Sequence, residues 1–475
     1  MYEERMDESK MREWKKKLIG DKRFYRRLFG IAVPMMIQMG ITNFASMLDN
    51  VMVGKVGTEQ MAGVAIANQL VFVYNLLVFG AVSGPGIFTA QFYGQRNHEG
   101  IRHTVRFKLI CCLVITVLGL FVMGGFGETL IQLYLHEEGS TGGMGIANTL
   151  GYGLDYLHIV MISFVPFAVV QVYAGTLKET GETQVPMKAG ILSVLVNLCL
   201  NYILIYGKFG APALGASGAA IGTVVARLVE MFMIVLWTHS HKERNPFVTG
   251  LYRSFRIPAE LVRRIFVKGV PLLLNEGLWS AGMAMLMQCY SVRGLDVVAA
   301  MNISNTLNNL FNVVFLSIGN SVAIIVGQLL GAGKMKEAKY SAYKIIFCST
   351  MICVGIAMCL AGASFVFPGI YETTQEIRDM ATGFVLVLAV YMPVNAFLHA
   401  TYFTIRSGGK TIITFLFDSG FVWCVSIPVA YCLSHFTGIP ILPLYFICCG
   451  VDAVKAVVGF VLLIKGKWLN NLVEV

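Results

Sequence analysis

Charge is scarce in this chain of 475 residues. Asp, Glu, Lys and Arg make up 13% of it, against about 25% in an ordinary soluble protein. Hydrophobic residues make up 56%, and uncharged stretches recur roughly every 40 residues, as in membrane helices joined by short loops. The composition therefore excludes an ordinary soluble domain and predicts a polytopic, all-α membrane protein.

Several patterns that carry chemistry are also missing. The sequence has no GxxxxGK[ST] loop for nucleotide phosphates, no HExxH and no GxSxG. Its eleven cysteines form no CxxC pair, and most lie in apolar stretches, where cysteine packs as a small hydrophobic residue. The polar N-terminus predicts no cleavable signal peptide. We therefore expect neither an enzyme nor a metal or cofactor, so that an ion gradient would drive any transport.

Twelve apolar stretches predict twelve membrane spans. They lie near residues 29–53, 61–87, 107–126, 154–177, 186–206, 213–238, 266–290, 298–325, 343–367, 382–404, 411–434 and 441–464. Lys and Arg number 31 in the N-terminal tail and the even-numbered loops, against 4 in the odd-numbered loops. Because positive residues collect on the cytoplasmic side, both termini are predicted to lie in the cytoplasm.

The two halves of the chain repeat one another at an offset of 237 residues. Identical residues at this offset include the pairs Pro34/Pro271, Gly57/Gly294, Asn68/Asn305, Gln91/Gln328 and Gly94/Gly331. Six spans bring each half back to its starting side, so the repeat predicts two six-helix bundles related by a pseudo-two-fold axis along the membrane normal. The expected division is a cytoplasmic tail 1–27, an N-lobe 28–238 (helices 1–6), a cytoplasmic linker 239–265, a C-lobe 266–465 (helices 7–12) and a cytoplasmic tail 466–475.

Few ionisable residues lie in the interior of the spans, away from their first residues, namely Asp49, Arg227, Glu230, Glu276, Asp418, Asp452 and Lys455. Two of the pairs, Arg227/Glu230 and Asp452/Lys455, are three residues apart on one helix and can neutralise themselves. We interpret these pairs as structural ion pairs or as gate elements on the cytoplasmic side. Asp418 fits a structural and a functional role equally well.

Asp49 and Glu276 have no basic residue close by in sequence. One interpretation is that each only fixes helix packing by hydrogen bonding. An unpaired acid in a membrane span is more often a binding site for a proton, Na⁺ or an organic cation. Burial favours the protonated form of a carboxyl group and a bound cation favours the ionised form, so such a group can exchange one for the other. This exchange is what an antiporter needs.

Amide side chains accompany these acids along the spans. They include Gln38, Asn68, Asn197, Asn201, Asn275, Asn305, Asn309 and Asn312. Hydrogen bonds between helices and the lining of a wet cavity both explain them. The acids themselves do not obey the repeat, because Asp49 aligns with Leu286, and Glu276 aligns with Met39. Ten residues correspond to about 15 Å of helix, so Glu276 is expected deeper toward the cytoplasm.

Several motifs resemble the multidrug and toxic compound extrusion (MATE) family. In the first half they are LDNVMVGKVGTEQMAGVAIANQ, TAQFYGQRN and NYILIYGKFGAPALGASGAAIGTVVARLVE. The second half carries GVPLLLNEGLWSAG, VAAMNISN and VGQLLGAGK, and the likeness extends from about residue 25 to 470. The resemblance implies a twelve-helix, two-lobed exporter of organic, often cationic, compounds in exchange for Na⁺ or H⁺, working by alternating access.

The resemblance also implies individual roles. The family's acid for the coupling cation matches Asp49, and the polar residues around it match Asn197, Asn201 and Thr223. The family's glutamate of the seventh span matches Glu276, shifted by about one turn, with Asn275 beside it. An aspartate that some members carry in the tenth span has no match in LVLAVYMPVNAFLHATYFTI, which favours coupling through the N-lobe.

The expected function is therefore secondary antiport in the cytoplasmic membrane, by a protein that acts as a monomer and binds no nucleic acid. One alternative is a flippase or exporter of lipid-linked saccharides on the same fold. Its cavity for anionic lipids should carry several basic residues, and the spans hold little beyond Arg227 and Lys455, against several acids. Another is a membrane enzyme or a receptor. The spans show no clustered catalytic residues, and a receptor has no need of two matching halves.

Overall fold

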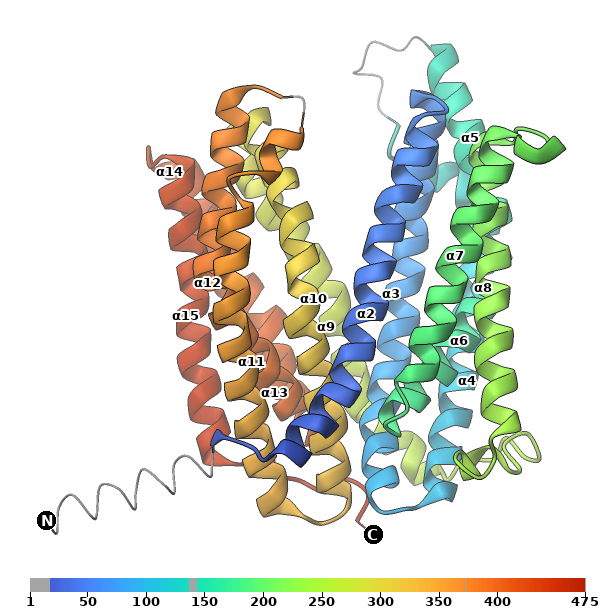
Figure 1. The fold of residues 1–475 in the computed structure, drawn as a ribbon, viewed down its shortest axis with the longest axis vertical. Helices are drawn as coiled ribbons and strands as arrows, with labels where there is room; N and C mark the ends of the chain where they lie inside the picture. The colour runs from blue at the N-terminus through green and yellow to red at the C-terminus, as the bar shows by residue number, and fades with distance from the viewer. Residues whose placement is uncertain (1–17, 136–142, 372, 475) are drawn as a thin grey trace, which may run out of the picture. The chain divides into compact units, whose positions relative to one another are not determined.

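The computed structural model describes residues 18–135, 143–371 and 373–474. Every regular element in these ranges is a helix (Figure 1), so the all-α class is confirmed. The first half contains α2 (Lys22–Gly54), α3 (Thr58–Gly94), α4 (His98–Gln132), α5 (Gly143–Met161), α6 (Phe164–Glu179), α7 (Gln184–Tyr206) and α8 (Gly215–Ser240). Short helical turns follow at Lys208–Gly210, between α7 and α8, and at Pro246–Val248.

The second half contains α9 (Ala259–Ser291), α10 (Leu295–Gly331), α11 (Met335–Ala363), α12 (Gln375–Ser407), α13 (Thr411–Phe415), α14 (Ile427–Phe436) and α15 (Ile441–Lys465). A short helical turn, Phe367–Ile370, precedes α12. Two π-helical turns, Leu416–Gly420 and Val422–Ser426, join α13 to α14, and the whole stretch Thr411–Phe436 forms one span.

Ten helices of the described chain are long and apolar enough to cross a membrane, and a bent pair adds an eleventh. The remaining predicted span is the seventh, 266–290, which lies in α9. The polar residues Asn275 and Glu276 lower the mean hydropathy of this helix. The fourth predicted span, 154–177, is not one straight helix, because α5 and α6 meet at an angle of 48°. Pro166 near the start of α6 has no N–H for the carbonyl four residues earlier, which explains the break.

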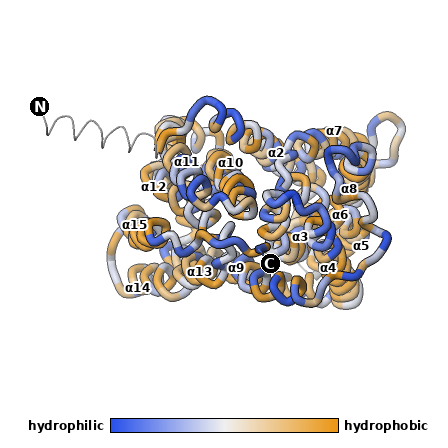
Figure 2. Tube along the Cα trace, turned by 90° about the horizontal axis from the view of Figure 1, so that it is seen from below, coloured by the Kyte–Doolittle hydropathy of each residue, from blue (hydrophilic) through white to orange (hydrophobic). Residues whose placement is uncertain are grey.

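Hydrophilic residues gather in the loops and hydrophobic residues cover much of the helices (Figure 2). Large apolar side chains stay exposed along the helices, as at Leu113 and Phe121 of α4, Met358 of α11 and Val457 of α15. On a soluble protein such surfaces would cause association. Here they match the hydrocarbon of a bilayer, as expected for a multi-pass membrane protein.

Contacts divide the chain into two compact units, each described by itself. Unit 1 contains the residues up to Met36, Ala90–Asn97 and Phe266–Val475, and unit 2 contains Ile37–Thr89 and His98–Ile265. Most of each unit comes from one half of the sequence. The start of α2 and the end of α3, however, pack with the second half. Residues 1–17 of the predicted N-terminal tail lie outside the described residues.

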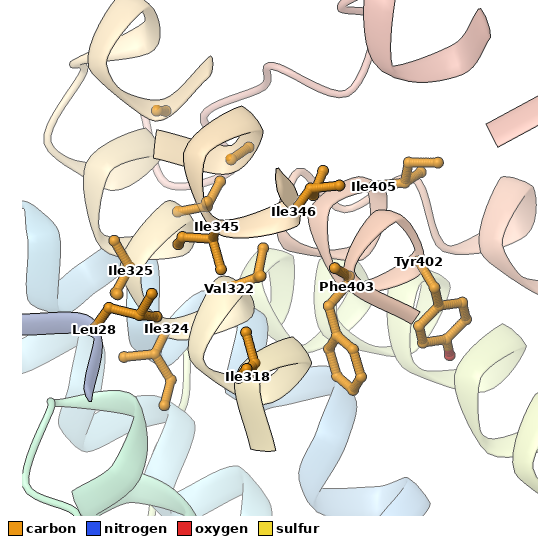
Figure 3. Packing of buried hydrophobic residues seen from close by; sticks show 14 of the residues in the cluster. Leu28, Ile318, Val322, Ile324, Ile325, Ile345, Ile346, Tyr402, Phe403 and Ile405 are labelled. Carbon is orange, nitrogen blue, oxygen red and sulfur yellow. The ribbon is translucent and has the colours of Figure 1, made fainter. Parts of the chain in front are cut away.

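The core of unit 1 forms around α10. Ile318, Val322 and Ile325 are fully or almost fully buried there, beside Ile345 of α11 and Phe403 of α12 (Figure 3). Side chains at positions three and four residues apart on one helix share a face, which is why the sequence folds this way. Lipid is as apolar as these side chains, so close packing rather than burial from water stabilises the contact.

Within unit 1, the end of α3 crosses the end of α10 in close backbone contact. A Cβ added to Gly94 would lie 1.9 Å from the carbonyl oxygen of Gln328, and one added to Gly331 would lie 1.9 Å from that of Gln91. Only glycine allows this approach. The end of α12 and the C-terminal segment contact the same crossing through Gln91. Its side chain donates to the carbonyl of Ser407 at 2.9 Å and accepts from the backbone N–H of Leu472 at 2.7 Å.

Candidate functional site

The clearest polar site of unit 2 forms around Asp49, near the end of α2. Asn201 of α7 donates from Nδ2 to Oδ1 of Asp49 at 2.8 Å. Asn197 lies one turn earlier on α7. When its amide is oriented to satisfy its hydrogen-bond partners, the amide nitrogen lies 3.1 Å from each carboxylate oxygen of Asp49. Its Oδ1 then accepts from the backbone N–H of Thr223 on α8 at 3.3 Å. Two amides of α7 thus hold the carboxylate of α2, and α8 orients one of these amides.

One amide oxygen at this site has no partner. Asn201 is 1% exposed, and its Oδ1 accepts no hydrogen bond within the described residues. A buried acceptor left unsatisfied is costly. Its position beside a carboxylate makes it available as an oxygen ligand for a cation.

Gly222 of α8 makes room for this amide. A Cβ at that position would lie 2.2 Å from Oδ1 of Asn201, far inside van der Waals contact. Glycine therefore lets α8 approach α7 closely enough for the site to form. The sequence motif GAAIGTVVA contains this glycine, but the sequence does not show that Gly222 lies against Asn201.

The Asp49 carboxylate opens on a cavity of about 380 Å³ within unit 2. Its polar lining comes from Ser46, Asp49, Asn68, Asn75, Tyr156, Ser163, Asn201, Thr223 and Arg227, and its apolar lining includes Phe164 and Phe167. The hydroxyl of Tyr156 donates to Oδ1 of Asn68 at 3.1 Å. The sequence did not identify Tyr156 as a cavity residue, because a tyrosine within an apolar stretch usually indicates a packing residue.

Arg227 also lines this cavity and pairs with Glu230, which is 4% exposed, at 2.8 Å. Its guanidinium lies 5.2 Å from the ring centre of Phe167. A second buried ion pair joins Lys108 of α4, 0% exposed, to Glu179 at the end of α6. Lys108 lies just inside the predicted third span, 107–126, and its position in an apolar stretch was the available signal.

The other predicted amides lie apart from this cavity. Gln38 is half-buried against α7, where its Nε2 is 3.1 Å from the position of a Cβ on Gly190. Asn305 and Asn309 are exposed on α10 of unit 1, and Asn312 is half-buried.

A second polar cluster lies in unit 1. Asn275 of α9, 2% exposed, donates to Oδ2 of Asp418 at 3.0 Å and to the hydroxyl of Tyr402 at 3.3 Å. Lys455 of α15 donates to Oδ1 of Asp418 at 3.2 Å. The sequence had paired Lys455 with Asp452 on its own helix, and this pairing is corrected: the long side chain reaches across to the neighbouring span instead.

Glu276 is half-buried beside this cluster, and Arg406 and Asp418 are the charged groups that act on it. It lies 17 residues from the start of α9, whereas Asp49 lies 27 residues from the start of α2. The two acids therefore occupy different levels of corresponding helices, as their alignment predicted.

Together these features describe a multi-pass membrane protein with a separate buried carboxylate cluster in each of two helical units. The sequence matches the MatE family over residues 34–203 and 271–432, and the chain belongs to this family. It is 26% identical over 417 residues to the multidrug resistance protein MdtK of Yersinia pseudotuberculosis, covering 86% of this chain and 87% of that protein.

Solved structures agree on the fold. A crystal structure of MATE in complex with MaL6 superposes with a TM-score of 0.83 at 20% identity, covering 96% of this chain and 98% of the other. A MOP superfamily transporter from Pyrococcus furiosus gives a TM-score of 0.82 at 20% identity, with the same coverage. Similarity at this identity establishes the shared architecture.

Proposed function

We propose that this protein exports organic, often cationic, compounds across the cytoplasmic membrane in exchange for Na⁺ or H⁺, by alternating access. The observation that carries the proposal is the Asp49 carboxylate, held by two asparagines beside an unpartnered amide oxygen. Its membership of the MatE family and its likeness to a multidrug resistance protein support the substrate class.

The chemistry follows from the surroundings of Asp49. A carboxylate in a membrane interior is stable when it carries a proton or when a cation sits beside it. Asn201 can supply an oxygen ligand to such a cation, while its amide nitrogen and that of Asn197 hold the carboxylate in place. Release of an organic cation into the cavity and uptake of the coupling ion then compete for one negative charge.

The remaining details belong to the same proposal. We infer that the N-lobe 28–238 and the C-lobe 266–465 move relative to each other during transport, that both termini lie in the cytoplasm, and that the protein acts as a monomer without enzymatic activity. The flippase alternative is not favoured. The basic residue that lines the cavity, Arg227, is already neutralised by Glu230, so little positive charge remains for an anionic lipid.

The test is dye efflux from membrane vesicles under an imposed Na⁺ gradient or an imposed pH gradient, one at a time. Asp49→Asn should abolish gradient-driven efflux while the protein reaches the membrane in normal amount. Asp155→Asn is the matched control, because Asp155 is an exposed acid on α5 of the same unit. Undiminished efflux by Asp49→Asn would refute the proposed role.

A further inference from the structure

The ammonium of Lys455 lies in a site with the chemistry of an organic-cation receptor. It contacts Oδ1 of Asp418 at 3.2 Å, and it lies 5.4 Å and 5.9 Å from the ring centres of Phe417 and Phe421. The Lys455 side chain is only 11% exposed. A carboxylate and two aromatic faces are what proteins use to bind alkylammonium groups.

The fold builds this site with an unusual backbone. Asp418 lies in the π-helical turn Leu416–Gly420, and such turns are rare and often mark functional positions. Asn275 of α9 supports the turn: its Oδ1 accepts from the backbone N–H of Ser419 at 3.3 Å and from its Oγ at 2.8 Å. The same amide donates to Oδ2 of Asp418 at 3.0 Å. Both carboxylate oxygens are therefore held.

The carboxylate of unit 2 differs in one respect. Asp49 is held by amides in the same way, but within the described residues no Lys, Arg or His nitrogen is paired with it. Asp418 has amide support as well as an ammonium from its own chain. The two halves differ in how their basic residue is used: Arg227 of α8 lines the Asp49 cavity but pairs with Glu230, whereas Lys455 of α15 pairs with Asp418.

We propose that Lys455 is a built-in cation: its ammonium permanently occupies an alkylammonium site formed by Asp418, Phe417 and Phe421 in unit 1. Under the proposed function, on which this inference rests, unit 1 then needs no exchangeable cation and coupling falls to Asp49. Removal of the lysine side chain beyond Cβ should leave a vacant site for a free primary alkylammonium ion. Asp452 and Glu276 are further carboxylates that act electrostatically on this region, and they add to its preference for a cation.

The test is chemical rescue of Lys455→Ala. The missing atoms correspond to n-propylammonium, so this ion is the probe, and 1-propanol is its neutral control of equal size. The readout is the thermal melting of purified protein in detergent, which requires no transport. At ten times its dissociation constant, a ligand that binds only folded protein raises the folded-to-unfolded ratio about 11-fold.

We expect n-propylammonium to raise the melting temperature of Lys455→Ala, and to have no such effect on the unaltered protein or on Lys455→Met, whose side chain fills the space. The double variant Lys455→Ala/Asp418→Asn should lose the response. Lys334→Ala, which removes a lysine from the exposed pair with Glu337, should show none. Equal stabilisation of all variants, or no stabilisation of Lys455→Ala, would overturn the inference.

If Lys455→Ala does not accumulate as folded protein, the yield of monodisperse protein after expression and solubilisation with n-propylammonium becomes the readout. Recovery with the ammonium ion but not with 1-propanol supports the inference, and recovery with neither refutes it. Because both readouts are independent of transport, failure here is distinguishable from failure of the Asp49→Asn efflux test.

Discussion

Gly222→Ala is a single-methyl perturbation of the Asp49 site, and its effect follows from one distance. The added Cβ would lie 2.2 Å from Oδ1 of Asn201, whereas carbon and oxygen atoms rarely approach within about 3 Å. The nearest other atoms of this amide and of the α7 backbone are close as well. The Asn201 side chain must therefore move by roughly 1 Å or rotate away from α8.

The hydrogen bond from Asn201 to Asp49, now 2.8 Å, would then exceed hydrogen-bonding distance. A hydrogen bond to a charged group contributes about 1.5–3 kcal/mol. Since about 1.4 kcal/mol corresponds to a tenfold change in an equilibrium constant, the half-saturating concentration of the coupling ion should shift by about 10- to 100-fold. For Na⁺ the shift is upward, because an oxygen ligand is displaced.

The assay is the initial rate of dye efflux from vesicles against the concentration of the coupling ion. Gly40→Ala on α2 is the matched control, because a Cβ there would meet nothing within 4 Å. If folded Gly222→Ala has the same half-saturating concentration of the coupling ion as the unaltered protein, then Asn201 does not hold the coupling site and the prediction is refuted.

Two further predictions concern stability. Lys108→Met should remove the ion pair between the fully buried Lys108 ammonium and Glu179 and lower the melting temperature of the protein. Most of this loss should be reversed in Lys108→Met/Glu179→Gln, and an unchanged melting temperature in the single variant would contradict the prediction. Truncation after Lys467 should remove the buried Trp468 side chain and free Gln91 from the amide of Leu472, and the lost Trp468 packing alone should cost about 3–5 kcal/mol. Hydrogen exchange at residues 90–97 should then be faster, while exchange in α7 stays unchanged; equal protection with and without the segment would disprove the role of this contact.

The internal repeat relates the helices of the two halves, but it does not relate their polar sites. Gly94 and Gly331 correspond because, where α3 crosses α10, each lies against the carbonyl of the other helix's glutamine, Gln328 or Gln91. Asp49 and Asp418 do not correspond. One is held by two amides of α7, the other by an amide of α9 and a lysine of α15. Symmetric packing therefore carries two different electrostatic environments.

The sequence by itself determined the helical class, the membrane spans and the choice of Asp49 as the principal acid. These depend on local properties: apolar stretches long enough for a bilayer, and the cost of a charge among them. It could also place Asn197 and Asn201 on one helix face, since a spacing of four residues fixes their relative direction.

The tertiary structure alone decided which side chains meet. Lys455 pairs with Asp418 rather than with Asp452 on its own helix, Lys108 reaches Glu179, and Tyr156 joins the cavity beside Asp49. Local turns such as the π-helical segment, and glycines such as Gly222 that admit a neighbouring helix, set these contacts. Residues far apart in sequence come together through helix packing. The periodicity of a sequence shows which residues share a face of one helix, but it does not show which other helix that face contacts.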